Sequence, residues 1–356
     1  MQKYTFNILI VLGALALLGL AHYEIIDNYV QAVIMFVGIN IIMSTSLNLV
    51  NGNMGEFTCG HAAFMCIGAY VASILSVLCF GSKFGGVLLP EGSAIFVFPL
   101  IIFAGGAVAA VSSLLVSVPS FKTRDDYLAI ITIAVNYIVI SAIENMDFLG
   151  GSRGFQGMKD TVWAMLDTHE APWMLFWVIN FTIFTVWIIR RFITSTYGKG
   201  VNAICQDETA AEIMSVNTNH IKLVNFMVSA GLAGIAGGLF AHIIGYVNPQ
   251  SFNILKSTEA MVMVYLGGMG SLSGAVLAAI GFTALMEILR SQTIIDVLLS
   301  PVTLVFPDWE PSAGIIKWII IPLLLVLIMQ FRPEGIMGNK ELSDVFPKLK
   351  KFYTFK

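Results

Sequence analysis

Long apolar stretches separated by short polar ones run through most of the chain. A helix needs about 20 apolar residues to cross a bilayer. Stretches near this length lie at residues 5–22, 30–50, 58–80, 93–118, 127–146, 172–190, 221–246, 254–268, 272–289 and 314–331. Because no long polar block interrupts them, the pattern predicts an all-α, polytopic membrane protein. We expect about ten transmembrane helices in one integral domain over residues 1–356.

The composition agrees with this prediction and narrows the chemistry. The 356 residues are 57% hydrophobic and 12% charged, whereas soluble domains are about a quarter charged. The chain has no G-x-x-x-x-G-K-[ST] phosphate loop, no H-E-x-x-H pair and no C-x-x-C pair among its four cysteines. We therefore expect a lipid-embedded protein that is not an enzyme, with no cofactor, no metal and no bound nucleic acid.

Basic residues gather in alternate loops. With ten spans, one side receives Lys3, the loop with Lys122 and Arg124, the loop from Arg190 to Lys222, and the tail 332–356. The other side receives mostly acidic loops, although Arg153, Lys159 and Arg290 also fall there. Because Lys and Arg are retained on the cytoplasmic side, both termini are predicted to be cytoplasmic.

The stretch NGNMGEFTCGHAAF, residues 51–64, is a polar break between two apolar runs. Gly55 and Gly60 are expected to let the chain turn, and Thr58 to cap the helix that follows. His61 is expected either to be hydrogen-bonded inside the fold or to face a substrate path.

Glycines also suggest how the helices are arranged. Gly-Asn-Met-Gly at residues 52–55 resembles Gly-Gly-Met-Gly at residues 267–270, where Gly268 and Gly270 are expected to form a turn. This likeness indicates either an internal repeat, which many transporters contain, or chance matching among 32 glycines. Gly231, Gly234 and Gly238 are expected to pack helices together, and we favour packing within this chain over packing between chains.

Other polar residues lie in or beside apolar spans. Asn136 and Glu144 share a helical face, so they either line a polar cavity or Glu144 simply reaches the interface. The glycine-rich stretch GGSRGFQG, residues 150–157, contains Arg153. Arg153 is expected either to meet a carboxylate of a substrate or partner, or to be solvated. With His61, these residues are our candidates for a translocation path or outer gate.

Residues 203–214 are predicted to form a short helix in a loop on the cytoplasmic side. Asp207 and Glu208 suit its first turn, and its apolar face contains Ala203, Ala210, Ile213 and Met214. Helices that lie on membranes are usually basic, and this helix is acidic. The pattern therefore favours docking into a groove of another protein.

Four blocks of sequence together carry a resemblance to a known family. They are Gly52–Tyr70; Tyr127–Gly154; Asp207–Glu212 with Lys222 and Ser229–Gly234; and Leu266–Gly274. In this order, they resemble the inner-membrane permeases of bacterial ABC importers for branched-chain amino acids. Within that family, the chain looks like the longer of the two sister permeases.

The resemblance implies the fold of an ABC importer permease and a set of partners. These are a sister permease, two cytoplasmic ATPases and an extracytoplasmic solute-binding protein, assembled at a bacterial inner membrane. Residues 195–220 match the family's coupling segment, which docks on an ATPase. The matching residues are Asp207, Glu208, Ala210, Ala211 and Glu212.

The chain departs from the family at Cys205 and Gln206, where an arginine and a glutamate are common, so a salt bridge from those positions is in doubt. Two other functions stay open. Related permeases carry urea or short amides. A self-sufficient secondary transporter would need its own coupling-ion site, for which His61, Glu144, Glu259 and Glu287 are the candidates.

Overall fold

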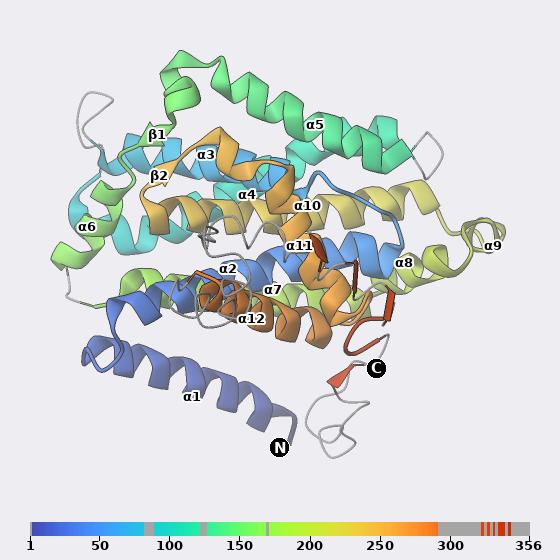
Figure 1. The fold of residues 1–356 in the computed structure, drawn as a ribbon, viewed down its shortest axis with the longest axis horizontal. Coiled ribbons are helices and arrows are strands. Elements are labelled where there is room, and N and C mark those ends of the chain that lie inside the picture. Colours follow the sequence, from blue (N-terminus) through green and yellow to red (C-terminus); the bar gives the residue numbers. More distant parts are fainter. Residues whose placement is uncertain are drawn as a thin grey trace, which may run out of the picture.

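The computed structural model of the chain is a set of roughly parallel helices (Figure 1). The two short strands and α6 lie at one end, here called the strand end; α8 and α9 lie at the other, here called the α9 end. The structure describes residues 2–81, 89–121, 127–168 and 171–290, and short pieces at 322–323, 326–327, 330–331, 334–338 and 341–342.

Helices account for nearly all regular structure in the described residues. They are α1 (Gln2–His22), α2 (Asn28–Asn48), α3 (His61–Phe80), α4 (Ala94–Ser120), α5 (Tyr127–Glu144), α6 (Lys159–Thr168), α7 (Trp173–Thr194), α8 (Thr196–Gln206), α9 (Glu208–Ile213), α10 (Thr218–Ile244), α11 (Ile254–Gly267) and α12 (Leu272–Ile288). Short helical turns are η1 (Leu49–Met54), η3 (Glu91–Ser93), η4 (Asp147–Leu149), η5 (Gly151–Arg153) and η6 (Pro249–Phe252). Strand β1 (Phe155–Gln156) pairs antiparallel with β2 (Tyr246–Val247), with Phe155 opposite Val247.

Polar side chains begin several helices. Ser195, Asn217, Asn253 and Ser271 each accept a hydrogen bond from a backbone N–H in the first turn of α8, α10, α11 and α12, respectively. The first N–H groups of a helix have no partner within it, so these side chains fix where each helix starts.

Among the described residues, six helical segments are long and apolar enough to cross a bilayer. They are Asn28–Met54, His61–Phe80, Ala94–Ser120, Tyr127–Glu144, Trp173–Thr194 and Thr218–Ile244. Each coincides with a predicted span, and two shorter apolar helices, Leu12–His22 and Leu272–Ile288, coincide with two more. The prediction of an all-α, polytopic membrane protein is therefore confirmed.

Two predicted spans remain, at residues 254–268 and 314–331. Helix α11 has 14 residues, so it is about 21 Å long and shorter than the apolar core of a bilayer. The predicted span 314–331, the preceding loop and the tail 332–356 lie wholly or largely outside the described residues.

The centre of the fold contains α2, α3 and α10. In each, 67% of the most apolar window is buried, against 28% for α5 and α7. Glycines bring α3 and α10 together: a Cβ added at Gly68 would lie 2.3 Å from the Gly234 Cα atom. A Cβ added at Gly231 would meet Ala110 of α4 at 3.1 Å, so these glycines pack within the chain, as favoured above.

Two groups of helices interlock around this centre. Helix α10 packs against α3 and α4, and α2 packs against α11 and α12. Both α3 and α11 begin after a break that follows a long helix. The internal repeat indicated by the two glycine stretches stays a prediction. The two glycine stretches lie against each other, because a Cβ added at Gly52 would be 2.3 Å from the Gly270 nitrogen.

Candidate functional site

The polar break between α2 and α3 lies toward the α9 end. Helix α2 continues into the π-helical segment η1, a rare geometry that is frequent at functional sites. Gly55 then turns the chain with a φ of 79°, a conformation that favours glycine. A Cβ added at Gly60 would lie 2.3 Å from the Thr132 carbonyl oxygen, so the break presses directly against α5.

The predicted cap of α3 by Thr58 is wrong. The N-cap position of α3 is Gly60, and no side chain caps the helix there. The Thr58 hydroxyl instead donates to Asn51 Oδ1 at 3.0 Å, because the chain folds back on η1 before α3 begins. Thr58 therefore closes the turn rather than starting the helix.

His61 is held inside the fold. Its side chain is buried, and Nε2 lies 2.8 Å from Ser46 Oγ of α2. The Ser229 hydroxyl of α10 donates to the Ser46 carbonyl oxygen at 2.6 Å. Of the two alternatives left open by the sequence, the structure supports a hydrogen-bonded histidine that joins the start of α3 to the centre of the bundle.

The segment expected to form one helix over residues 203–214 forms two. Asp207 has an extended conformation, with φ of −162° and ψ of 110°, and separates α8 from α9. Its carboxylate accepts a hydrogen bond from the Ala210 N–H at 3.0 Å. Asp favours the N-cap position, so the chain starts a new helix at Glu208 instead of continuing α8.

The predicted apolar face of this segment is mostly exposed. Ala203 is half-buried and Ala210 is exposed, and Ile213 and Met214 are 79% and 77% exposed at the end of α9. Ala211, which lies outside that face, is buried. The Glu212 carboxylate accepts a hydrogen bond from the Thr218 hydroxyl at 2.9 Å, which ties α9 to α10. The segment therefore presents two large apolar side chains on a helix that is fixed to the bundle.

A cluster of three charges joins the break to this segment. Lys222 Nζ lies 2.7 Å from Glu56 Oε1 and 2.8 Å from Glu208 Oε2. Lys222 and Glu56 are buried, and Glu208 is partly exposed. Sequence reasoning missed this cluster because its members are far apart along the chain. The available signal was a lysine inside an apolar helix, which requires a partner.

The other candidate path residues occupy different surroundings. Asn136 of α5 is fully buried, and neither its Oδ1 nor its Nδ2 atom has a partner in the described part of the chain. Glu144 accepts a hydrogen bond from Gln250 of η6. Arg153 is exposed in η5, and its carbonyl oxygen accepts a hydrogen bond from the Tyr246 hydroxyl at 2.6 Å.

Residues 150–154 also spell G-x-S-x-G, the pattern of a hydrolase nucleophile elbow. In an elbow, the serine sits on a sharp turn between a strand and a helix. Here Ser152 lies in the 3₁₀ turn η5, directly after the turn η4. The structure therefore gives this match no support as a hydrolase site.

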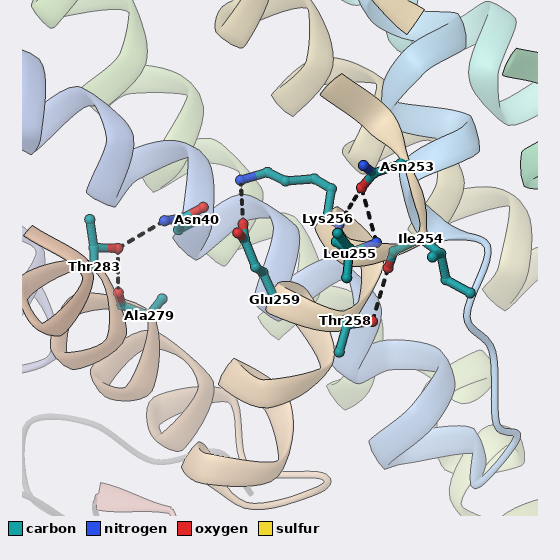
Figure 2. Close-up of polar contacts among 9 residues, drawn as sticks. All are labelled: Asn40, Asn253, Ile254, Leu255, Lys256, Thr258, Glu259, Ala279 and Thr283. Carbon is teal, nitrogen blue, oxygen red and sulfur yellow. Dashed lines mark hydrogen bonds and ion pairs between the residues drawn. The ribbon is translucent and has the colours of Figure 1, made fainter. Parts of the chain in front are cut away.

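A second polar cluster lies among α2, α11 and α12 (Figure 2). Lys256 Nζ lies 2.9 Å from Glu259 Oε2, and both side chains are largely buried. Nearby, Asn40 Nδ2 of α2 donates to Thr283 Oγ1 of α12 at 2.9 Å. The sequence offered Glu259 as a candidate for a coupling-ion site; the structure pairs it with a lysine one turn earlier on α11.

Apolar helices of membrane-spanning length, interrupted by buried polar breaks and joined by a fixed helical segment at one end, define a polytopic membrane protein. No group of three or more His, Cys, Asp or Glu side chains in its described residues is arranged to hold a metal ion. Residues 29–329 match the family described as the branched-chain amino acid transport system / permease component. The chain belongs to this family and is a permease subunit of an importer.

Curated relatives carry the same description. The chain is 29% identical to the permease protein LivM of Salmonella typhimurium strain LT2 over 325 residues, covering 84% of this chain and 68% of the relative. LivM of Escherichia coli strain K12 gives the same identity and coverage. LivH of Escherichia coli strain K12 is 21% identical over 332 residues, covering 87% of this chain and 96% of the relative. No solved structure matches the chain.

Proposed function

We propose that this permease belongs to an ATP-driven importer of branched-chain or related amino acids, forms half of the translocation path, and docks a cytoplasmic ATPase through α9. The observation that carries the docking proposal is the pair of exposed apolar side chains, Ile213 and Met214, at the end of α9. Large exposed apolar side chains gathered in one place mark interaction sites.

The composition of α9 favours a protein partner over the lipid surface. Asp207 caps the short helix, and Glu208 and Glu212 lie within it, whereas helices that lie on membranes are usually basic. An apolar helix end rimmed by charges suits a groove on another protein. The chain lacks a phosphate loop, so the ATPases would be separate subunits.

The distribution of basic residues indicates which end of the permease faces the cytoplasm. The positive-inside rule assigns the α9 end and both termini to the cytoplasm. In a bacterial inner membrane, the strand end would then face an extracytoplasmic solute-binding protein. Relatives named LivM and LivH both match the chain, which supports a sister permease as the second half of the path.

The substrate proposal rests on the names of the relatives, which describe high-affinity transport of branched-chain amino acids. Urea or short amides are the alternative substrates. Competition during uptake by the whole importer distinguishes them. We expect leucine, isoleucine and valine to compete with one another and urea to have no effect; competition by urea alone would favour the alternative.

Asn136, Glu144 and Arg153 are proposed to lie along the path or at its outer gate, whereas the hydrogen bond of His61 to Ser46 favours a structural role for that side chain. Asn136 offers the sharpest test because its amide is buried without a described partner. Replacing such a group with an apolar one of similar size removes a desolvation penalty of about 1–3 kcal/mol. Because Asn136 destabilises the fold and is nevertheless present, its buried amide favours a role in transport.

Asn136→Leu is therefore expected to raise the melting temperature of the purified permease while lowering uptake about tenfold, the change that 1.4 kcal/mol produces. Thermal unfolding and uptake are measured on the same preparation. A stabilised variant with normal uptake would contradict a role in the path. Ile140→Leu, on the same buried face of α5, provides the control and should leave uptake unchanged.

A self-sufficient secondary transporter is the second candidate, and the buried Lys256–Glu259 pair favours it because intramembrane charges mark ion pathways. Purification from the native membrane separates the two. We expect two ATPase subunits and a sister permease to co-purify with the chain. Ion-driven uptake by the chain alone would support the second candidate instead.

A further inference from the structure

The cluster of Glu56, Lys222 and Glu208 connects three segments that the sequence keeps apart. Lys222 lies near the start of α10, Glu56 lies in the break after η1, and Glu208 is the first residue of α9. Both contacts to Lys222 Nζ are shorter than 3 Å, at 2.7 Å to Glu56 and 2.8 Å to Glu208. One ammonium group therefore holds the break and α9 at the same time.

Stability alone is a poor explanation for this arrangement. The side chains of Lys222 and Glu56 are only 5% and 8% exposed, and buried ion pairs contribute little or nothing compared with well-packed apolar groups of similar size. Their use in the best-studied cases is to fix one relative position of the parts that they join. Here the parts are the break and the segment containing α8 and α9.

Packing around the cluster reinforces the same connection. A Cβ added at Gly55 would lie 3.0 Å from Cys205 Sγ, so the break lies directly against the end of α8. Asn225 of α10 donates to the Leu49 carbonyl oxygen of η1 at 2.8 Å. A movement of the segment with α8 and α9 would therefore be transmitted to the break by both the ion pair and this close packing.

The break in turn holds the start of α3. The Cys59 N–H donates to Thr132 Oγ1 of α5 at 3.2 Å, and the Ala62 N–H donates to Ser257 Oγ of α11 at 2.9 Å. Displacement of Glu56 would shift these residues, because only two residues separate Glu56 from Cys59. The start of α3 is thus the point where a displacement from α9 reaches α5 and α11.

We infer that Glu208 and Lys222 are positioning residues for transport: their ion pair transmits the movement of α9 to the start of α3. This inference rests on the proposed function, in which α9 moves with an ATPase. It assigns distinct tasks to neighbouring residues of the segment. Ile213 and Met214 hold the ATPase, whereas Glu208 faces Lys222 and passes the movement into the bundle.

Glu208→Gln tests this inference in the complete importer, reconstituted with its sister permease, ATPases and binding protein. The variant keeps the pair between Lys222 and Glu56, so the buried ammonium retains a charged partner. We expect the ATPases to co-purify normally and to hydrolyse ATP, while the amount of amino acid imported per ATP hydrolysed falls at least about tenfold, a change of 1.4 kcal/mol in the coupling step. Glu208→Asp, which keeps a carboxylate in place, should restore most of that ratio.

Arg290→Gln is the matched control, because it also removes one partner of an ion pair, the 3.8 Å contact with Glu287, but lies just beyond α12 and away from α9. Its import per ATP should match that of the natural chain. An unchanged ratio in Glu208→Gln, or an equal loss in the control, would overturn the inference. Loss of the ATPases from Glu208→Gln would also overturn it, because Glu208 would then contact the ATPase itself. Failure of the natural chain to bind ATPases would instead refute the proposed function.

Discussion

Replacing both Ile213 and Met214 with aspartate is expected to release the ATPase subunits and abolish ATP-driven uptake. Both side chains are exposed at the end of α9, so the variant should insert and fold normally. Burying two such side chains in a partner contributes about 3–6 kcal/mol, and their loss should weaken docking at least about 100-fold. Co-purification of the ATPases and uptake by whole cells measure the two effects.

A variant at the opposite end provides the control for this experiment. Met146→Asp places one aspartate on a partly exposed apolar residue between α5 and η4, far from α9. The ATPases should remain bound to it. Normal ATPase binding by the Ile213→Asp, Met214→Asp double variant would show that α9 is not the docking surface.

Gly237→Leu is expected to prevent accumulation of folded permease. A Cβ at this position would lie 1.9 Å from the Met65 carbonyl oxygen, which belongs to the backbone of α3 and cannot move aside without moving the helix. Inserting a larger side chain into a tight core costs about 1–3 kcal/mol even where side chains can adjust, so we expect about 3 kcal/mol or more here. Membrane-inserted protein and its melting temperature are the quantities to measure.

Gly281→Leu makes the same substitution on α12, where a Cβ would meet no atom within 4 Å. This control should accumulate normally and keep its melting temperature. Comparable amounts of folded protein from both variants would mean that α3 and α10 do not pack as closely as described.

The sequence predicted the membrane-spanning helices well because their signal is local. Twenty apolar residues in a row need no knowledge of neighbours to be recognised, and the bilayer forces such segments to be helical. The same reasoning could not predict the residue at which α3 begins. That start depends on the close approach of Gly60 to Thr132 of α5, a contact between distant parts of the chain.

The sequence predicted where the helical segment with α8 and α9 lies along the chain, but not the contacts that join it to the bundle. The acidic pattern located the segment with α8 and α9, but the capping role of Asp207 breaks the helix that the apolar spacing predicted. The partner of Lys222 could not be read from the sequence, because an ion pair between remote residues leaves no periodic pattern. The same holds for His61, whose hydrogen bond to Ser46 forms only when α2 and α3 pack together.

The proposed importer is tested by uptake into liposomes that contain this permease, its sister permease and the ATPases, with the binding protein and radiolabelled leucine outside. We predict uptake only when ATP is sealed with the ATPases, and none by the permease alone under any ion gradient. Leucine uptake by the lone permease, driven by an ion gradient and unaffected by ATP, would contradict the proposal that it works as one subunit of an ATP-driven importer.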